Sequence, residues 1–408
     1  MIHSTKAARF HYLDHARGFV ILLVVLQHAI QTYAQMWGGN WYFVPTEMDR
    51  SHAFDAIFFF TDGFIMQALF FISGMFVLPS LQKRGWLSFT WEKIVRLVFP
   101  FVFGVIFLVA PLSYAKYSLG NPGIGYFDYW FNIFFQQRLQ AAGYWFLGYL
   151  VMFTFTAAIF YSVFPFVIRL LGALAAWMVR RPILGYLVFA GLSALMIGIS
   201  DLIWGTPWWL GFGKLFYARA NMLATYIFYF ALGVGVRYAG VLSNKEVLQK
   251  MSVHWSKWVV LTAVLAVLYL SYCIFWMYDG AFSDEIVYHF AGGGTWVDVW
   301  PLMLDLGPGL LIRTTLHGFL CAAQSITLIV VLYRFTNKDI PFWTSLAACS
   351  YGIYFFHEPF VVWTQYYMLG SVLPAVIKAC IAFIVGLGLS WLLTDKVLRK
   401  LPVTRRVF

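Results

Sequence analysis

Charged residues are scarce in this chain of 408 residues: Asp, Glu, Lys and Arg together make up only 11% of it, whereas 62% is hydrophobic. A soluble domain usually carries about 25% charged residues, so this composition excludes an ordinary soluble protein. The long apolar runs have the length that a transmembrane helix needs. The sequence therefore predicts an all-α integral membrane protein.

Cysteines and metal-ligand patterns are also scarce. The four cysteines all fall within apolar runs, which is typical of packing thiols rather than disulfides. No set of His, Cys, Asp and Glu has the spacing of a metal site, so we expect neither a metal nor a bound cofactor. Without internal repeats, low-complexity runs or linkers, residues 1–408 are predicted to form one domain. No small-residue cleavage site follows the first apolar run, which indicates an uncleaved helix.

Ten transmembrane helices can be counted, approximately at 16–36, 56–80, 96–115, 144–172, 183–203, 219–237, 257–278, 311–334, 344–367 and 372–394. With both termini in the cytoplasm, most of the 28 Lys and Arg residues lie on the cytoplasmic side, as the positive-inside rule requires. The net charge of +11 is spread over short loops, which argues against nucleic acid as a partner. We expect a multi-pass protein of the cell (cytoplasmic or inner) membrane, with membrane lipid around it.

Two exterior segments, 116–143 and 279–310, are longer than a tight helical hairpin needs. Both are rich in aromatic residues and glycine. Because irregular backbone is not tolerated where it faces lipid, they are predicted to cap an exterior opening or to re-enter the membrane. Ordinary surface loops are the alternative.

One apolar stretch, from Tyr12 to Gln35, carries two polar side chains on one face. Arg17 and His28 are eleven residues apart, which in a helix places them within about 20° of each other and about 16 Å apart along the axis. A cation at one membrane surface thus shares a stripe with a titratable imidazole near the midplane. Ionisable groups inside a membrane are costly and usually functional.

Other predicted spans also carry ionisable residues at membrane depth: Asp62 in the second, His317 in the eighth, His357 and Glu358 in the ninth and Lys378 in the tenth. An isolated buried charge would neutralise, so we expect these groups to pair around a hydrated cavity. Two alternatives stay open. Lys378 could form a structural ion pair with Glu358 or Asp62, and His317 could make a helix–helix hydrogen bond.

Three cations are expected to converge at the cytoplasmic surface. Lys93 and Arg96 open the third span, as Arg17 opens the first. Cations at span ends are ordinarily topology anchors. Three of them below a midplane histidine would also bind a polyphosphate, with arginine giving bidentate contacts.

Several motifs together resemble the membrane-bound acyltransferase-3 family. They are LDHARG…VVLQH around Arg17 and His28, FFISGMF at 70–76, Lys93-x-x-Arg96 before LVFP, YWFLGYL at 144–150, and SYGIYFFHEPF at 350–360. They occur in the expected order over most of the chain. The layout is most similar to the glucan-succinylating branch of the family.

The resemblance implies transfer of an acyl group, acetyl or succinyl-like, from cytoplasmic acyl-CoA to a hydroxyl of an extracytoplasmic carbohydrate or glycan. It implies His28 as the catalytic histidine, which we interpret as a general base oriented by Asp62. The donor-binding residues would be Arg17, Lys93, Arg96 and Ser73. Residues expected at the acceptor or in the cavity are Trp145, His317, Tyr351, His357, Glu358 and Lys378. A covalent acyl intermediate on His28 or Ser73 stays open.

This chain departs from the family pattern at two positions. Lys93 stands where arginine is usual, which removes bidentate phosphate recognition there, and Glu358 follows His357 where a neutral residue is common. We also expect no attached periplasmic hydrolase-like domain. All of the chemistry is therefore expected in the membrane unit.

Two other functions fit parts of the sequence. Membrane His, Asp, Glu and Lys residues also form the proton relays of proton-coupled transporters, although inverted repeats are not seen here. A non-enzymatic protein that binds lipid or polymer is the third possibility, but it would not need the aligned Arg17 and His28.

Overall fold

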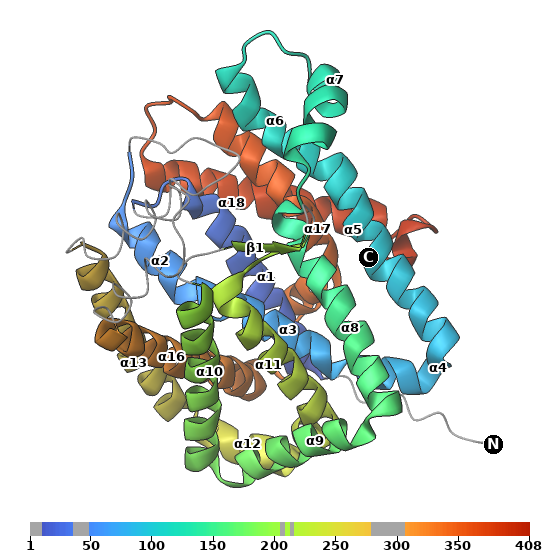
Figure 1. Cartoon of the computed structure of the whole chain (residues 1–408), viewed down its shortest axis with the longest axis vertical. Helices are drawn as coiled ribbons and strands as arrows, with labels where there is room; N and C mark the ends of the chain where they lie inside the picture. The colour runs from blue at the N-terminus through green and yellow to red at the C-terminus, as the bar shows by residue number, and fades with distance from the viewer. Residues whose placement is uncertain (1–9, 36–48, 205–208, 213–215, 279–306) are drawn as a thin grey trace.

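The computed structural model describes residues 10–35, 49–204, 209–212, 216–278 and 307–408 (Figure 1). Its helices are α1 (His11–Gln31), α2 (His52–Asp62), α3 (Ile65–Met75), α4 (Val77–Lys93), η2 (Ile94–Val98), α5 (Phe99–Phe103), η3 (Gly104–Leu108), α6 (Val109–Gly120), α7 (Tyr126–Asp128), η4 (Tyr129–Arg138), η5 (Ala142–Tyr144), α8 (Trp145–Val163), α9 (Pro165–Arg180), α10 (Pro182–Trp204), α11 (Ala220–Tyr238), η6 (Val241–Ser243), α12 (Lys245–Val253), α13 (Trp255–Tyr278), α16 (Gly307–Thr336), α17 (Pro341–Tyr367), α18 (Ala375–Leu392), η7 (Leu393–Leu398) and η8 (Thr404–Arg406). A short antiparallel hairpin, β1 (Trp209–Phe212) with β2 (Phe216–Arg219), is the exception to a helical fold. Apart from this hairpin, the regular secondary structure of the described residues is helical, which confirms the all-α prediction.

Within the described residues, eight helices or helix runs are long and apolar enough to cross a membrane, which confirms a multi-pass membrane protein. They lie at 11–31, 52–75, 77–120, 142–163, 182–201, 255–274, 308–336 and 375–398. The two other expected spans, 219–237 and 344–367, are also helical. The apolar part of α11 is shorter, at Met222–Tyr238, and the 27 residues of α17 include the polar His357, Glu358 and Gln365.

Two of the expected spans are interrupted, each for a local reason. The span expected at 144–172 breaks at Phe164, which has φ −125° and ψ 58°, because the proline that follows disfavours the α conformation. The span expected at 56–80 breaks between Asp62 and Ile65. There Gly63 lies against the ring of His317, so that a Cβ at this position would collide with the imidazole.

The segment 116–143 folds back on the helix that precedes it, at the top of Figure 1 around α6 and α7. The Tyr129 hydroxyl donates to Ser113 Oγ at 2.8 Å, and the Trp130 indole donates to the Ile106 carbonyl at 3.2 Å. The segment is therefore mostly helical, through η4, and is anchored by its aromatic side chains. Most of the second expected cap, 279–310, lies outside the described residues.

Helices α1 and α17 form the central pair, and they run in the same direction. Gly18, near the start of α1, is within contact distance of Leu346 on α17. Near the other end, the Gln365 amide donates to the carbonyls of His28 and Ala29 at 3.0 and 3.1 Å. Because the two helices stay in contact over this length, polar side chains on the facing sides meet at matching levels.

Candidate active site

His28 meets two polar side chains of α17 in the middle of the central pair. Its Nδ1 lies 3.3 Å from Nε2 of His357 and 3.9 Å from Oε1 of Glu358. The Glu358 side chain is 5% exposed and the His28 side chain 19%. We call these three residues the His28 cluster. It joins a nearly buried carboxylate to a histidine that is still partly accessible.

The hydrogen bonds around His357 determine which nitrogen of His28 can accept a proton. Nδ1 of His357 lies 3.0 and 2.8 Å from the carbonyls of Ile353 and Tyr354. A carbonyl only accepts, so this nitrogen carries the proton, and in the neutral ring Nε2 is the acceptor. The contact with His28 then takes Nδ1–H of His28 as its donor. A neutral His28 in this arrangement has its lone pair on Nε2, the tautomer that a general base requires.

Glu358 is held against the chain segment that leads into α8. A Cβ at Gly143 would collide with the Glu358 carboxylate, so only glycine allows this approach. The preceding Ala142 has φ 44°, a left-handed conformation that costs energy for a residue with a side chain. The Tyr354 hydroxyl donates to the Gly143 carbonyl at 2.7 Å. The backbone strain therefore sits directly beside the carboxylate of the cluster.

Pro359, which follows Glu358, allows a hydrogen bond between α17 and the segment just before α8. Pro359 has no N–H, so it leaves the carbonyl of Phe355, four residues earlier, without its helical partner. The Tyr144 hydroxyl donates to that carbonyl at 2.8 Å. The aromatic residues of this segment are thus docked on the turn of α17 that carries His357 and Glu358.

Gln365 is a residue of the site that the sequence analysis did not single out. It is fully buried, and its amide holds the backbone of His28 and Ala29 as described above. The sequence could have indicated Gln365, because it follows Glu358 by two helical turns and therefore lies on the same face of the helix. Its distance of more than three hundred residues from His28 in the chain hid the contact.

Asp62 lies at the end of α2 and accepts a hydrogen bond from Gln27 Nε2 at 3.1 Å. Gln27 precedes His28 but projects from a different face of α1. The carboxylate that lies 3.9 Å from the His28 ring is Glu358. The orienting role expected for Asp62 therefore has a second candidate, which the sequence analysis had placed at the acceptor.

His317 belongs to a second group of buried polar residues, on α10 and α16. Its ring lies 5.0 Å from that of Tyr269 and against Gly63, next to Asp62. One turn earlier on α16, Arg313 forms an ion pair with the buried Asp201. We call Asp62, Asp201, Arg313 and His317 the Asp201 cluster.

Two of the expected donor-binding residues, Arg17 and Arg96, contact the first half of α17. Arg17 donates to Ser350 Oγ and to the Ala347 carbonyl, both at 2.9 Å. The backbone carbonyl of Arg96 accepts from the Tyr351 hydroxyl at 2.6 Å. Since Ser350 and Tyr351 are adjacent, Arg17 and Arg96 approach one level of α17 from two sides. This level is two turns from His357, on the N-terminal side of α17.

We call the region around Arg17, Lys93 and Arg96 the basic end. Within it, the side chains of Arg96 and Lys93 have different surroundings. Arg96 is exposed; it pairs with Glu92 at 3.2 Å and donates to the Arg406 carbonyl at 3.0 Å. Lys93 is half-buried, with its ammonium 5.3 Å from the centre of the Phe89 ring. The lysine that replaces the usual arginine thus packs on an aromatic ring, whereas Arg96 connects η2 to the C-terminal segment.

The remaining predicted residues lie on elements around the central pair. Trp145 packs its ring 5.5 Å from that of Tyr226, at the start of α8. Ser73 is half-buried on α3. Lys378 is buried on α18, between Ala375 and Ala379, which pack against the end of α1. Its pairing with Glu358 or Asp62 stays a prediction. Among the described residues, no three His, Cys, Asp or Glu side chains gather as metal ligands.

Comparison with known proteins identifies the family of the chain. The sequence model of the acyltransferase-3 family, an acyltransferase domain, matches residues 10–395. This range includes the three residues of the His28 cluster as well as Arg17, Lys93 and Arg96. Neither a curated protein nor a solved structure gave a match. An enzyme of this family transfers an acyl group from a donor to a hydroxyl of an acceptor. The chain belongs to the membrane-bound acyltransferase-3 family.

Proposed function

We propose that this acyltransferase moves an acyl group, acetyl or succinyl-like, from acyl-CoA to a hydroxyl of a carbohydrate or glycan across the membrane, with His28 as the general base. The observation that carries the proposal is the alignment of the His28 cluster and the basic end along α1 and α17. Arg17 and Ser350 mark one level of this pair, and His28 and His357 mark the other.

The basic end suits a donor with phosphates at one end and a thioester at the end of a flexible arm. Arg17, Lys93 and Arg96 supply the positive charge, and arginine binds phosphate in a bidentate manner. Arg17 and His28 are about 16 Å apart along α1. The donor would therefore bind with its phosphates at the basic end and its arm directed along the central pair towards His28.

The tautomer of His28 fits the chemistry of this transfer. Nε2 takes the proton of the acceptor hydroxyl as its oxygen attacks the thioester carbon. The carbon–sulfur bond then breaks, and the departing CoA thiolate takes the proton back from the imidazolium. Glu358, beside Nδ1, stabilises that imidazolium while it exists, as the carboxylate of a catalytic triad does.

The acceptor would bind on the side of His28 away from the basic end. Of the residues expected at the acceptor, Trp145 and Lys378 would lie on that side. Tyr351 instead lies beside Arg96 at the basic end, and His317 belongs to the Asp201 cluster. Aromatic side chains are dense between Tyr126 and Trp145, and Tyr144 docks on the same turn of α17 as the His28 cluster. Aromatic faces with hydroxyl groups nearby suit the apolar faces and hydroxyls of a sugar ring.

Transfer across a membrane can be tested in proteoliposomes. Labelled acyl-CoA is enclosed on one side and a β-glucan or oligosaccharide acceptor is supplied on the other, and the labelled ester on the acceptor is measured. We expect ester formation with wild-type protein, none with His28→Ala, and wild-type rates with His11→Ala, a matched loss of a histidine on α1. Donor consumption without any labelled acceptor would contradict the proposed acceptor. Transport of label without ester formation would contradict acyl transfer and favour a transporter.

A further inference from the structure

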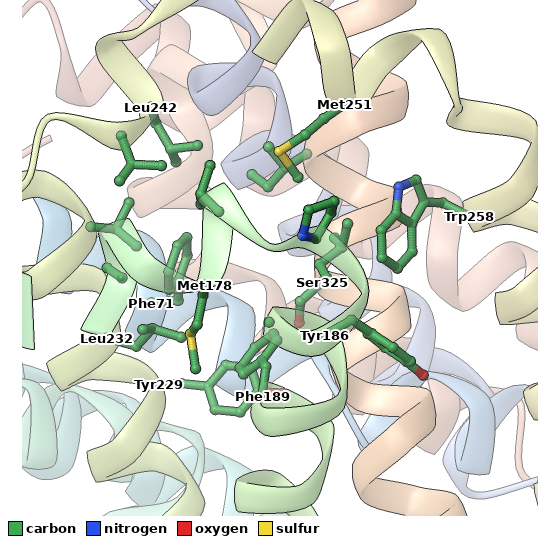
Figure 2. A pocket seen from close by; sticks show the side chains of 18 residues that line it. Phe71, Met178, Tyr186, Phe189, Tyr229, Leu232, Leu242, Met251, Trp258 and Ser325 are labelled. Atoms are coloured by element: carbon green, nitrogen blue, oxygen red, sulfur yellow. The ribbon is translucent and has the colours of Figure 1, made fainter. Parts of the chain in front are cut away.

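A second cavity, with a volume of about 130 Å³, is separate from the central pair. Its lining comes from α3, α9, α10, α11, η6, α12, α13 and α16, and none of the 18 lining residues is charged (Figure 2). Figure 2 shows Phe71, Met178, Phe189, Leu232 and Trp258 around it. This volume is smaller than the range of about 300–1,000 Å³ that is usual for a pocket enclosing a whole small molecule, so it suits part of a longer ligand.

The hydroxyl groups in the lining already have partners within the protein. Tyr186 donates to the Phe319 carbonyl at 3.1 Å, and Ser325 donates to the Cys321 carbonyl at 2.8 Å. The Tyr229 hydroxyl lies 3.1 Å from Ser193 Oγ. A sugar or a nucleotide would therefore find few groups to recognise it. The chemistry of the lining fits a hydrocarbon chain.

The cavity opens at the basic end of the molecule. Pro182 lines it and is exposed at the turn between α9 and α10. Leu242, another lining residue, accepts a hydrogen bond through its carbonyl from Tyr12 at the start of α1, at 2.9 Å. Arg17 lies little more than one turn further along that helix. In Figure 1, α9 and α12 both lie at this lower end of the molecule.

Exposed cations stand next to the lining on three elements. Arg181 directly precedes Pro182 and lies over the Trp177 ring at 6.0 Å. Lys250 precedes Met251 on α12, and Lys257 precedes Trp258 on α13. Glu246, one turn before Lys250, is the acidic residue of α12. Three exposed cations thus directly precede, in the sequence, residues that line the uncharged cavity.

We propose that this cavity binds part of one acyl chain of an anionic phospholipid, whose phosphate lies among Arg181, Lys250 and Lys257. The chain alone gives little selectivity, because the surrounding lipid tails are as apolar as the cavity. The cations provide it, since a basic cluster at the membrane surface attracts anionic headgroups. The site would hold α9, α12 and α13 together at the mouth, independently of acyl transfer.

Brominated phospholipids test the proposal, because bromine on the chain quenches a nearby tryptophan. The signal that counts is the difference in quenching between wild-type protein and Trp258→Phe, measured in detergent with brominated phosphatidylglycerol or brominated phosphatidylcholine. We expect saturable quenching of Trp258 at a lower concentration of phosphatidylglycerol than of phosphatidylcholine. Equal quenching by the two lipids, or quenching that Trp258→Phe leaves unchanged, would overturn the proposal.

Charge variants separate the site from general attraction to the membrane. Lys250→Gln with Lys257→Gln should weaken phosphatidylglycerol binding by about fivefold for each cation lost. Lys396→Gln with Lys400→Gln, the same change of charge on η7 and beyond it, should leave it unchanged. Equal weakening in both double variants would contradict a specific headgroup site. Ala175→Phe, which fills the cavity, should abolish the quenching of Trp258. If this variant does not fold, the two double charge variants, whose substitutions are on the surface, still test the headgroup site.

Discussion

Two clusters in the described part of the chain combine histidine with carboxylate side chains, but in different arrangements. The His28 cluster joins two histidines and Glu358 on α1 and α17. The Asp201 cluster, on α2, α10 and α16, contains an ion pair between Asp201 and Arg313 beside His317. In the first, a carboxylate faces a ring that can gain or lose a proton. In the second, a carboxylate faces a guanidinium that stays charged.

This difference separates a reactive group from a structural one. A paired buried charge stabilises only as long as its partner is present, and removal of one partner typically costs about 3–5 kcal/mol. A neutral histidine that donates through one ring nitrogen can accept a proton at the other. Only the His28 cluster is also aligned with the basic end, through the Arg17 contact with Ser350. We therefore assign proton transfer to the His28 cluster and stability to the Asp201 cluster.

The largest expected effect comes from removing the two histidines separately. His28→Ala should lower turnover by about 10²- to 10⁴-fold, the usual contribution of a general base, with a melting temperature close to wild type. His317→Ala should keep turnover within about tenfold, since its ring packs against Tyr269 and Gly63. Initial rates of ester formation at saturating donor measure both. More than a tenth of wild-type turnover in His28→Ala would remove this histidine from the mechanism.

The next effect concerns the binding of the donor. Arg17→Ala and Arg96→Ala should each weaken acyl-CoA binding by about ten- to a hundredfold, because a hydrogen bond to a charged group contributes about 1.5–3 kcal/mol. Added salt should weaken binding to the wild type, since the contacts lie at a wet surface. Calorimetry with a non-hydrolysable donor analogue measures the dissociation constant.

Lys83→Ala, an exposed cation outside the contacts described here, is the control for donor binding. Unchanged affinity in both arginine variants would show that these residues act only as topology anchors. Arg17→Lys should give an intermediate affinity, because it keeps the charge but loses the bidentate geometry.

The smallest effect on turnover is expected from the ion pair. Asp201→Asn should destabilise the protein by about 3–5 kcal/mol, because Arg313 would then be buried without its partner. The protein that remains folded should turn over at the wild-type rate. Arg313→Met in the same chain should recover part of the lost stability, which thermal melts in detergent measure. If the double variant were less stable than Asp201→Asn alone, the two residues would not act as a pair.

The sequence predicts the class of the fold and the residues of the site better than their contacts. The alignment of Arg17 with His28 follows from helical periodicity, and α1 carries both on one helix. The pairing of α1 with α17 does not follow, because it joins residues more than three hundred positions apart. For the same reason Glu358 was expected at the acceptor, and Gln365 and Gly143 were not singled out. The break at Phe164 was readable from Pro165.

The assignment of proton transfer to the His28 cluster is tested most directly by asking which carboxylate, Glu358 or Asp62, orients His28. Glu358→Gln and Asp62→Asn both keep size and remove charge, so single-turnover transfer with saturating donor compares them on equal terms. We expect Glu358→Gln to slow transfer by up to about 10⁴-fold, the loss seen when the carboxylate of a catalytic triad becomes an amide, with donor affinity unchanged. Asp62→Asn should have the smaller effect. A wild-type rate in Glu358→Gln, together with a large loss in Asp62→Asn, would contradict the assignment of proton transfer to the His28 cluster as described.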